Sequence, residues 1–522
     1  MTTATLPVPV NGTRSLRIAG RPWPVLLPSL RDARLHVAAT LLTVQVLGQT
    51  VVGWDLSIAQ ILLCLATCFV LEVMIVARRR GVLAWPASAL LTGNGVALLL
   101  RVPGTEHGDW WSTRGWPIFV GTAAVAVLSK YLIRVGDRPL FNPSNLALVL
   151  CFLVLGIGRV EPQDLWWGPW SPGLAVTYAV IIVGGVLITR RLHLLGVVVS
   201  FWVALALALG VVALSGHAIT ARWHVGLLTD RAWWWIIVSS PETLIFLFFM
   251  ITDPRTAPQG RVARVAYGLG VGVLAAVFAA PQQTEFATKV AILSALVAMC
   301  AFRPLLERAL PAPGSDEDRW SEVRMALRRN RRVPAIGAIT TGLVVVALVI
   351  AGGSSRALLP DHALQGERPQ VAVGAVPDVA VNDSVADVVL GFDLSDLDVL
   401  ARDLVEDLEI EAEALRTGDA GAAAHAAVGV RLDDLRTRME TSGTVTVPRY
   451  RFTSLSLILH RELAEGQAAP RLGIEAHGSV RLDRAVDGRT TPGDTEAHDG
   501  VYLLTEVDGH WLIDDERAVP GS

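Results

Sequence analysis

Two carboxylates in one apolar stretch are the residues of this chain best placed to do chemistry. The stretch SSPETLIFLFFMITDPRTAP, from Ser239 to Pro258, carries Glu242 near its start and Asp253 towards its end. A carboxylate at membrane depth costs about 2.5 kcal/mol or more, so it is usually retained for a function. Eleven residues make about three helical turns. On a regular helix both side chains would therefore project from one face, where they could handle protons or a cation.

A structural interpretation of the same carboxylates stays open. Ser240-Pro241 can begin a helix, which would leave Glu242 in its first turn, at the positive end of the helix dipole. Pro254 places Asp253 at a helix end, where Arg255 could pair with it. The two interpretations differ in whether the carboxylates line a polar interior or lock the ends of a helix.

A lysine and two asparagines form a second candidate site. Lys130 precedes the run Phe141-Asn142-Pro143-Ser144-Asn145, in which the proline favours a helix start. The free N–H groups of that start, with the side chains of Asn142 and Asn145, would suit an anionic or carbonyl-bearing ligand. The alternatives are a plain helix cap for the asparagines and an interfacial anchor for Lys130 and Glu72.

Other motifs point to packing. Cys64 and Cys68 lie four residues apart and could bind a metal, but two small buried side chains explain them better. The run Gly268-Leu269-Gly270-Val271-Gly272 has no preceding strand, so close helix packing is favoured over dinucleotide binding. The sequence contains no P-loop, no CxxC cluster and no HExxH motif. We predict no metal site and no complete catalytic machinery in this chain alone.

The composition is that of a membrane protein joined to an acidic domain. The 522 residues are 52% hydrophobic and 18% charged, with a mean hydropathy of +0.47, which is too apolar for an ordinary soluble protein. Residues 1–352 carry 30 basic and 17 acidic residues, whereas residues 353–522 carry 15 and 31. Nothing in this pattern indicates a nucleic-acid partner; the expected partner of the first part is the lipid bilayer.

Eleven apolar segments are long enough, or nearly so, to span a bilayer. They lie near 35–53, 56–77, 82–100, 117–134, 140–157, 173–189, 192–214, 233–251, 266–280, 285–302 and 334–352. If all eleven span, the arginine-rich loops fall on one side and tryptophan-rich loops on the other, which predicts a cytoplasmic N-terminus and an extracytoplasmic tail. No cleavable signal peptide is visible, and we expect a multi-pass protein of the inner (plasma) membrane.

The acidic tail is predicted to fold as a separate α+β domain. Helical patterns over about 383–440 precede strand patterns, and Val507-Asp508-Gly509-His510 is a hairpin signal. This order resembles the nuclear-transport-factor-like fold. The predicted organisation is an N-terminal cytoplasmic arm (1–33), a ten-span core (34–310), a basic linker (311–333), an eleventh span (334–352), a second linker (353–377) and the extracytoplasmic domain (378–522).

Three motifs in order resemble the NqrB/RnfD family of membrane subunits. They are SALLTGNGVALLLRVP (88–103), the run from Lys130 to FNPSN (141–145), and FFMITDPRTAP (248–258). The stretch Ser-Pro-Glu before the last motif looks closer to the enediyne-cluster branch of that superfamily. The resemblance implies a ten-helix, flavin-associated core that passes electrons with partner subunits. The residues of this chain that resemble the family's recurrent positions are Glu72, Lys130, Asn142, Pro143, Thr252, Asp253 and Pro254.

One departure concerns the flavin. Respiratory members attach FMN to a threonine in an extended outer loop, but the corresponding loop here, GRVEPQDLWWGPWSP (158–172), contains none. Thr220 lies in a superficially similar run two spans later. We therefore expect a noncovalent flavin, FMN or riboflavin, and no covalent FMN. In this interpretation Lys130, Asn142, Asn145 and Thr252 contact the flavin, while Glu242 and Asp253 handle a proton or cation.

The resulting hypothesis is a non-autonomous redox subunit that acts with other redox or pathway subunits. The first rival is a translocator of small molecules or ions on the same core, because such proteins use broken spans with midplane carboxylates. The second is a membrane anchor that presents the tail domain.

Overall fold

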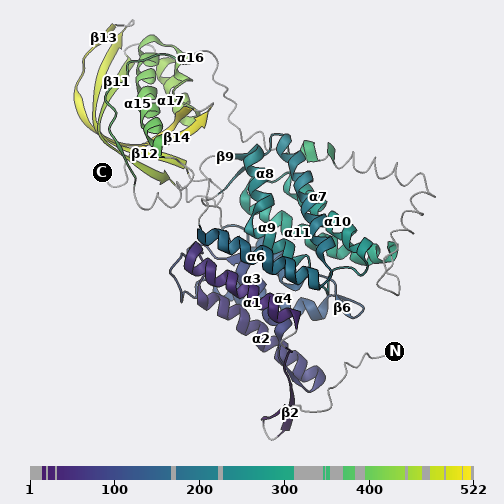
Figure 1. The fold of residues 1–522 in the computed structure, drawn as a ribbon. Coiled ribbons are helices and arrows are strands. Elements are labelled where there is room, and N and C mark those ends of the chain that lie inside the picture. The colour runs from purple at the N-terminus through teal and green to yellow at the C-terminus, as the bar shows by residue number, and fades with distance from the viewer. Residues whose placement is uncertain are drawn as a thin grey trace, which may run out of the picture. The chain divides into compact units, whose positions relative to one another are not determined.

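The computed structural model describes residues 14–18, 21–29, 32–165, 172–221, 227–310, 345–346, 348–352, 368–381, 394–440, 445–460, 471–486, 489–507 and 510–518. The chain folds as two units. One comprises Met1–His217, Thr229–Gln282 and Phe286–Ser354, and the other Ala218–Leu228, Gln283–Glu285 and Ser355–Ser522. The first is helical, and the second holds the large sheet (Figure 1).

The first unit is a bundle of apolar helices, and each of the first ten predicted apolar segments is helical in it. The helices are α1 (Ala33–Leu47) continued by the π-helix η1 (Gly48–Val52), α2 (Ile58–Arg80), α3 (Ala87–Leu99), α4 (Trp116–Leu132), α5 (Pro143–Leu155), α6 (Pro172–Arg191), α7 (Leu195–Leu214), α8 (Asp230–Ser239), α9 (Pro241–Ile245), the π-helix η2 (Phe246–Met250), α10 (Arg261–Ala279) and α11 (Glu285–Ala309).

Seven helical stretches within the described residues are long and apolar enough to cross a membrane. They are Ala33–Val52, Ile58–Arg80, Pro172–Arg191, Leu195–Leu214, Asp230–Met250, Arg261–Ala279 and Glu285–Arg308, while α3, α4 and α5 are shorter. The chain is thus a multi-pass helical membrane protein, and the count of ten spans stays a prediction. The predicted linker 311–333 and most of the eleventh span lie outside the described residues; 345–346 and 348–352 are helical.

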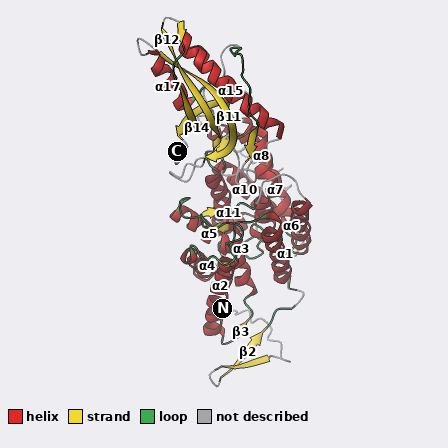
Figure 2. Cartoon of the chain, turned by 90° about the vertical axis from the view of Figure 1, so that its left-hand side faces the viewer, coloured by secondary structure: helices red, strands yellow, loops and turns green. Residues whose placement is uncertain are grey.

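Short strands connect the helices. β1 (Arg14–Ile18) and β2 (Arg21–Leu26) form an antiparallel hairpin, and β3 (Leu83–Ala84) joins β2 in parallel. β4 (Leu100–Arg101) pairs with β7 (Glu161–Pro162), β5 (Arg134–Val135) with β6 (Arg138–Pro139), and β8 (Ala218–Thr220) with β9 (Leu227–Thr229). The described strands of the N-terminal arm therefore belong to a small sheet, visible beside the bundle in Figure 2.

The glycines of the 268–272 run bring α10 against α7. A Cβ on Gly268 would lie 2.1 Å from the hydroxyl of Ser200 and 2.6 Å from the carbonyl of Val197. A Cβ on Gly272 would lie 2.7 Å from the carbonyl of Phe201. Only glycine lets the two backbones approach this closely, so the run serves helix packing.

The span that carries Glu242 is broken. α8 ends at Ser239, Ser240 is extended with ψ 147°, and α9 begins at Pro241, whose ring fixes φ and removes a donor that a helix start does not need. η2 follows directly and ends at Met250. Because this segment is not a regular helix, the expectation that Glu242 and Asp253 share one face loses its basis.

The second unit is an α+β fold. Its sheet has the order β10 (Val379–Val381), β11 (Val445–His460), β12 (Arg471–Val486), β14 (Thr495–Val507) and β15 (His510–Ala518), with β13 (Arg489–Thr491) on β12. β11, β12, β14 and β15 run antiparallel, and Val507 pairs with His510 as the hairpin signal predicted.

One long helix packs on this sheet. α15 (Leu394–Thr417) buries Leu400, Leu404 and Leu408 against strand residues such as Leu457 and Ile474. The shorter helices α16 (Ala420–Ala423) and α17 (Gly429–Glu440) follow it. Figures 1 and 2 show the helices gathered on one face of the sheet. The helices precede the long antiparallel strands in the chain, as the sequence pattern predicted.

Candidate functional site

Glu242 belongs to a group of three charged side chains. It lies in the first turn of α9, as the structural interpretation expected, and its Oε1 accepts the backbone N–H of Leu165 at 3.0 Å. Lys289, in the second turn of α11, places its Nζ 3.4 Å from the same oxygen and also pairs with Asp164. The side chains of Lys289 and Glu242 are 12% and 14% exposed. One ammonium group thus joins two carboxylates.

The backbone around this group is held by hydrogen bonds. Ser240 caps α9 by accepting the N–H of Thr243 at 2.8 Å. The indole N–H of Trp54 donates to the carbonyl of Leu165 at 2.7 Å, which orients the peptide that binds Glu242. The second carboxylate oxygen of Glu242, Oε2, is buried and has no hydrogen-bond partner within the described part of the chain.

Lys130 forms a second buried ion pair. Its Nζ lies 2.8 Å from Oε1 of Glu72, so α4 and α2 are joined across 58 residues of sequence. The two residues are 7% and 8% exposed. An interfacial anchor would extend its charged end to water, whereas here each charge neutralises the other inside the bundle.

The two asparagines bind backbone. Asn142 caps α5, because its Oδ1 accepts the N–H of Asn145 at 3.2 Å, and its Nδ2 donates to the carbonyl of Met250 at 3.0 Å. Nδ2 of Asn145 donates to the carbonyl of Leu293 in α11 at 2.9 Å. The asparagines therefore tie α5 to the end of η2 and to α11. Oδ1 of Asn145 is buried without a partner among the described residues.

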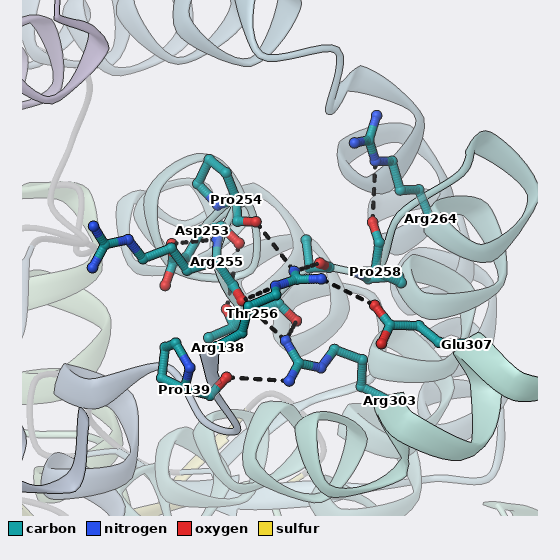
Figure 3. Close-up of polar contacts among 11 residues, drawn as sticks. Arg138, Pro139, Asp253, Pro254, Arg255, Thr256, Pro258, Arg264, Arg303 and Glu307 are labelled. Atoms are coloured by element: carbon teal, nitrogen blue, oxygen red, sulfur yellow. Dashed lines mark hydrogen bonds and ion pairs between the residues drawn. The ribbon is translucent and has the colours of Figure 1, made fainter. Parts of the chain in front are cut away.

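The TDPRTAP segment, residues 252–258, is a loop whose carbonyls bind arginines (Figure 3). Arg303 of α11, which is 1% exposed, donates to the carbonyls of Arg255 (2.9 Å), Thr256 (3.3 Å) and Pro139 (3.2 Å). Arg138 of β6 donates to the carbonyls of Arg255 (2.9 Å), Pro254 (3.3 Å) and Ala257, and it pairs with Glu307 at 3.2 Å. The loop follows the end of η2, where backbone carbonyls lack helical partners.

Asp253 and Thr252 make hydrogen bonds to backbone groups at the start of this loop. Oδ1 of Asp253 accepts the backbone N–H of Arg255 at 3.0 Å, and the Asp253 carbonyl accepts the N–H of Thr256 at 3.1 Å. The hydroxyl of Thr252 donates to the carbonyl of Phe248. Figure 3 shows the Arg255 guanidinium pointing away from the loop, so it is the backbone of Arg255 that binds the aspartate.

Three further candidate residues make contacts within the protein. Thr220 donates its backbone N–H and its hydroxyl to the carbonyl of Gln283, at 2.9 and 3.3 Å. Cys64 and Cys68 are buried free thiols that face carbonyls of α4. Within the described residues, no group of three or more His, Cys, Asp and Glu side chains could hold a metal ion.

Sequence reasoning missed Asp164, Lys289 and Arg303. Lys289 lies inside the predicted segment near 285–302, and Arg303 follows directly after it. A cation within an apolar segment is itself a sign of an internal partner. Asp164 stands in the predicted loop 158–172 and carries no comparable signal. Its pairing with Lys289 joins positions 125 residues apart.

In the second unit, a charged cluster lies between helices and sheet. Arg431 binds both oxygens of Glu411, with the shortest contact at 2.6 Å, and it also pairs with Glu516. Burial raises the pKa of Glu411, opposed by the Arg431 charge. His498 lies 2.7 Å from the hydroxyl of Tyr502, and burial lowers the pKa of this histidine, opposed by Glu516.

The four residues expected to contact a flavin do not fit that role together. Lys130 is neutralised by Glu72, both polar atoms of Asn142 are bound, and the Thr252 hydroxyl donates to Phe248. Among the four, Asn145 alone keeps a buried acceptor without a partner in the described structure.

The fold and these buried charges define a multi-pass helical membrane protein joined to an α+β domain. The family model of the NQR2, RnfD, RnfE family matches residues 158–312, which is under a third of the chain. The matched segment holds Asp164, Glu242, Lys289 and the TDPRTAP loop. No curated protein matches the sequence.

Proposed function

We propose that this protein is a membrane subunit of an electron-transport system that acts with partner proteins rather than as a complete enzyme. The similarity of residues 158–312 to the NQR2, RnfD, RnfE family carries the proposal. The buried charge groups of the same segment support it, because charges retained within a membrane bundle mark functional paths. The partners would supply the electron donor and acceptor.

The cofactor in this proposal is a noncovalent flavin, FMN or riboflavin. Lys130, Asn142 and Thr252 already make hydrogen bonds within the protein, whereas Asn145 keeps a buried acceptor oxygen without a partner among the described residues. Covalent attachment is not part of the proposal, because no threonine stands in the loop 158–172. In the proposed placement, the ten spans of the core and an eleventh span cross the inner (plasma) membrane. The N-terminus is then cytoplasmic and the nuclear-transport-factor-like domain lies outside.

Flavin content tests the proposal. The full chain is purified in mild detergent and precipitated with acid, and flavin is measured in supernatant and pellet. Flavin in the supernatant near one per chain would support the redox role. Flavin in the pellet would mean covalent attachment and would direct attention to Thr220. A well-folded preparation without flavin in either fraction would count against the redox role.

A translocator is the second candidate, favoured by one observation. The span with Glu242 is broken at Ser240, and its carboxylate meets a lysine from another helix. Discontinuous helices with charged groups at their ends are how secondary transporters build binding sites. The Glu242→Gln variant separates the two: loss of transport with flavin retained favours translocation, and loss of flavin reduction favours electron transport.

A further inference from the structure

We infer that the end of α2 and the N-terminal sheet together form a binding site for the headgroup of an anionic phospholipid. Arg17 and Arg80 bind the phosphate of the headgroup, and Leu26, Leu27 and Trp85 contact the acyl chains next to it. The site goes beyond the proposed function, because it needs neither a bound flavin nor a partner protein.

One side of α2 is exposed and apolar as far as its last turn, where it becomes basic. At about 3.6 residues per turn, the spacings from Leu62 to Phe69 and from Leu62 to Arg80 are close to two and to five whole turns. All three side chains therefore lie on one side of the helix, and all three are exposed. Because α2 is long and apolar enough to cross a membrane, this side suits acyl chains along its length and a headgroup at Arg80.

The small sheet is joined to this same side of α2. Gly81 ends the helix in the left-handed conformation, with φ 65°, and the chain then turns back. The ring of Trp85 meets the ring of Phe69 edge-on, with the centroids 6.3 Å apart. The N–H of Trp85 donates to the carbonyl of Leu26 in β2 at 2.8 Å. Trp85 and Leu27 are 47% and 60% exposed, so the apolar side of α2 continues onto the sheet.

The register of the hairpin places Arg17 on the face of the sheet that carries Leu26. Arg17 pairs with Pro22, and Pro22, Pro24 and Leu26 alternate along β2, so all of them belong to one face. Leu16 belongs to the opposite face. Arg17 and Leu26 are both exposed, so this face presents a cation and an apolar side chain together, as the end of α2 does.

The charge of these two segments selects an anionic lipid. Residues 1–31 contain four arginines and residues 73–100 contain three, and neither range contains an acidic residue. Basic side chains next to a span attract anionic headgroups, and each one strengthens the association about fivefold. The apolar neighbours favour a lipid over a soluble anion or an acidic protein, because they continue the side of α2 that suits acyl chains.

Quenching of a fluorescent probe by lipid tests the site. The full chain with Leu27→Cys is labelled with a thiol-reactive bimane and placed in nanodiscs in which phosphatidylcholine is replaced stepwise by phosphatidylglycerol. A constant share of the lipid carries a nitroxide on its headgroup, which quenches the probe at close range. The four native cysteines are buried, and the unsubstituted chain, treated in the same way, gives the background. Leu16→Cys supplies the matched probe on the other face of the sheet.

We expect quenching of the Leu27 probe to rise with the phosphatidylglycerol content, and quenching of the Leu16 probe to stay weaker. Arg17→Gln combined with Arg80→Gln should weaken the lipid association of the sheet about thirtyfold, at about fivefold for each arginine. Arg17→Lys combined with Arg80→Lys should keep it, because the charges remain. Arg78→Gln is the matched control, since Arg78 lies about 200° around the helix from Arg80.

Three results would overturn the site. The first is equal quenching of the Leu27 probe in discs of phosphatidylcholine and of phosphatidylglycerol, and the second is an Arg78→Gln chain that loses as much quenching as an Arg80→Gln chain. The third is a Leu27 probe that no lipid quenches; a signal that changes with protein concentration would then assign this surface to a second copy of the chain. If the double glutamine variant does not fold, the lipid dependence of the Leu27 probe in the chain with its native arginines decides alone.

Discussion

Replacing Lys130 with methionine would leave Glu72 as an unpaired charge in the bundle. The two side chains lie 2.8 Å apart and are 8% and 11% exposed. Removing one partner of a buried ion pair costs about 3–5 kcal/mol. We therefore expect Lys130→Met to lower the apparent free energy of unfolding by about that amount, although methionine fills a similar volume.

The double variant Lys130→Met with Glu72→Met should recover most of this loss, because replacing a whole buried pair with apolar side chains is often neutral or stabilising. Unfolding in mild detergent, titrated with a denaturing detergent and followed by tryptophan fluorescence, measures all three proteins. Arg78→Gln serves as a control on the same helix, since Arg78 is exposed at the end of α2.

Two results would refute this reasoning. If the double variant were as unstable as Lys130→Met, the loss would come from packing and not from an orphaned charge. If Lys130→Met kept full stability but lost bound flavin, Lys130 would contact the cofactor, as the sequence motif suggested. Flavin content should therefore be measured on every variant.

Three further predictions concern other parts of the fold. Arg303→Met removes the donor of three hydrogen bonds to backbone carbonyls, and each such bond contributes about 1.5–3 kcal/mol to stability. The loss should lower the melting temperature and expose residues 252–258 to proteases. Gly268→Ala should cost about 1–3 kcal/mol by overpacking, whereas Gly121→Ala, with open space at its Cβ, should be tolerated in the same melting assay. Burial lowers the pKa of His498, so the unfolded state takes up a proton on this histidine at a higher pH than the folded state does. The second unit should therefore lose stability as the pH falls through the ordinary histidine pKa of about 6.5. His498→Gln should weaken that dependence, as read by limited proteolysis of β14 in the full chain; an unchanged pH profile would contradict the assignment.

The sequence by itself determined the local features of this protein. Apolar segments of sufficient length predicted the helices of the first unit, because a backbone in lipid must satisfy its own hydrogen bonds. Ser240-Pro241 and Pro254 marked the breaks around Glu242, since proline removes a donor and fixes φ. Alternating side chains and the turn after Val507 predicted the antiparallel strands of the second unit.

Only the tertiary structure decided which charges meet. Asn142 was recognised as a possible cap, but its bond to Met250 and that of Asn145 to Leu293 depend on how three helices pack. Lys289 could not be matched to Asp164, because 125 residues separate them. The physical reason is that periodicity and turn chemistry act over a few residues, whereas the neutralisation of a buried charge depends on whichever helix the packing of the whole bundle brings beside it.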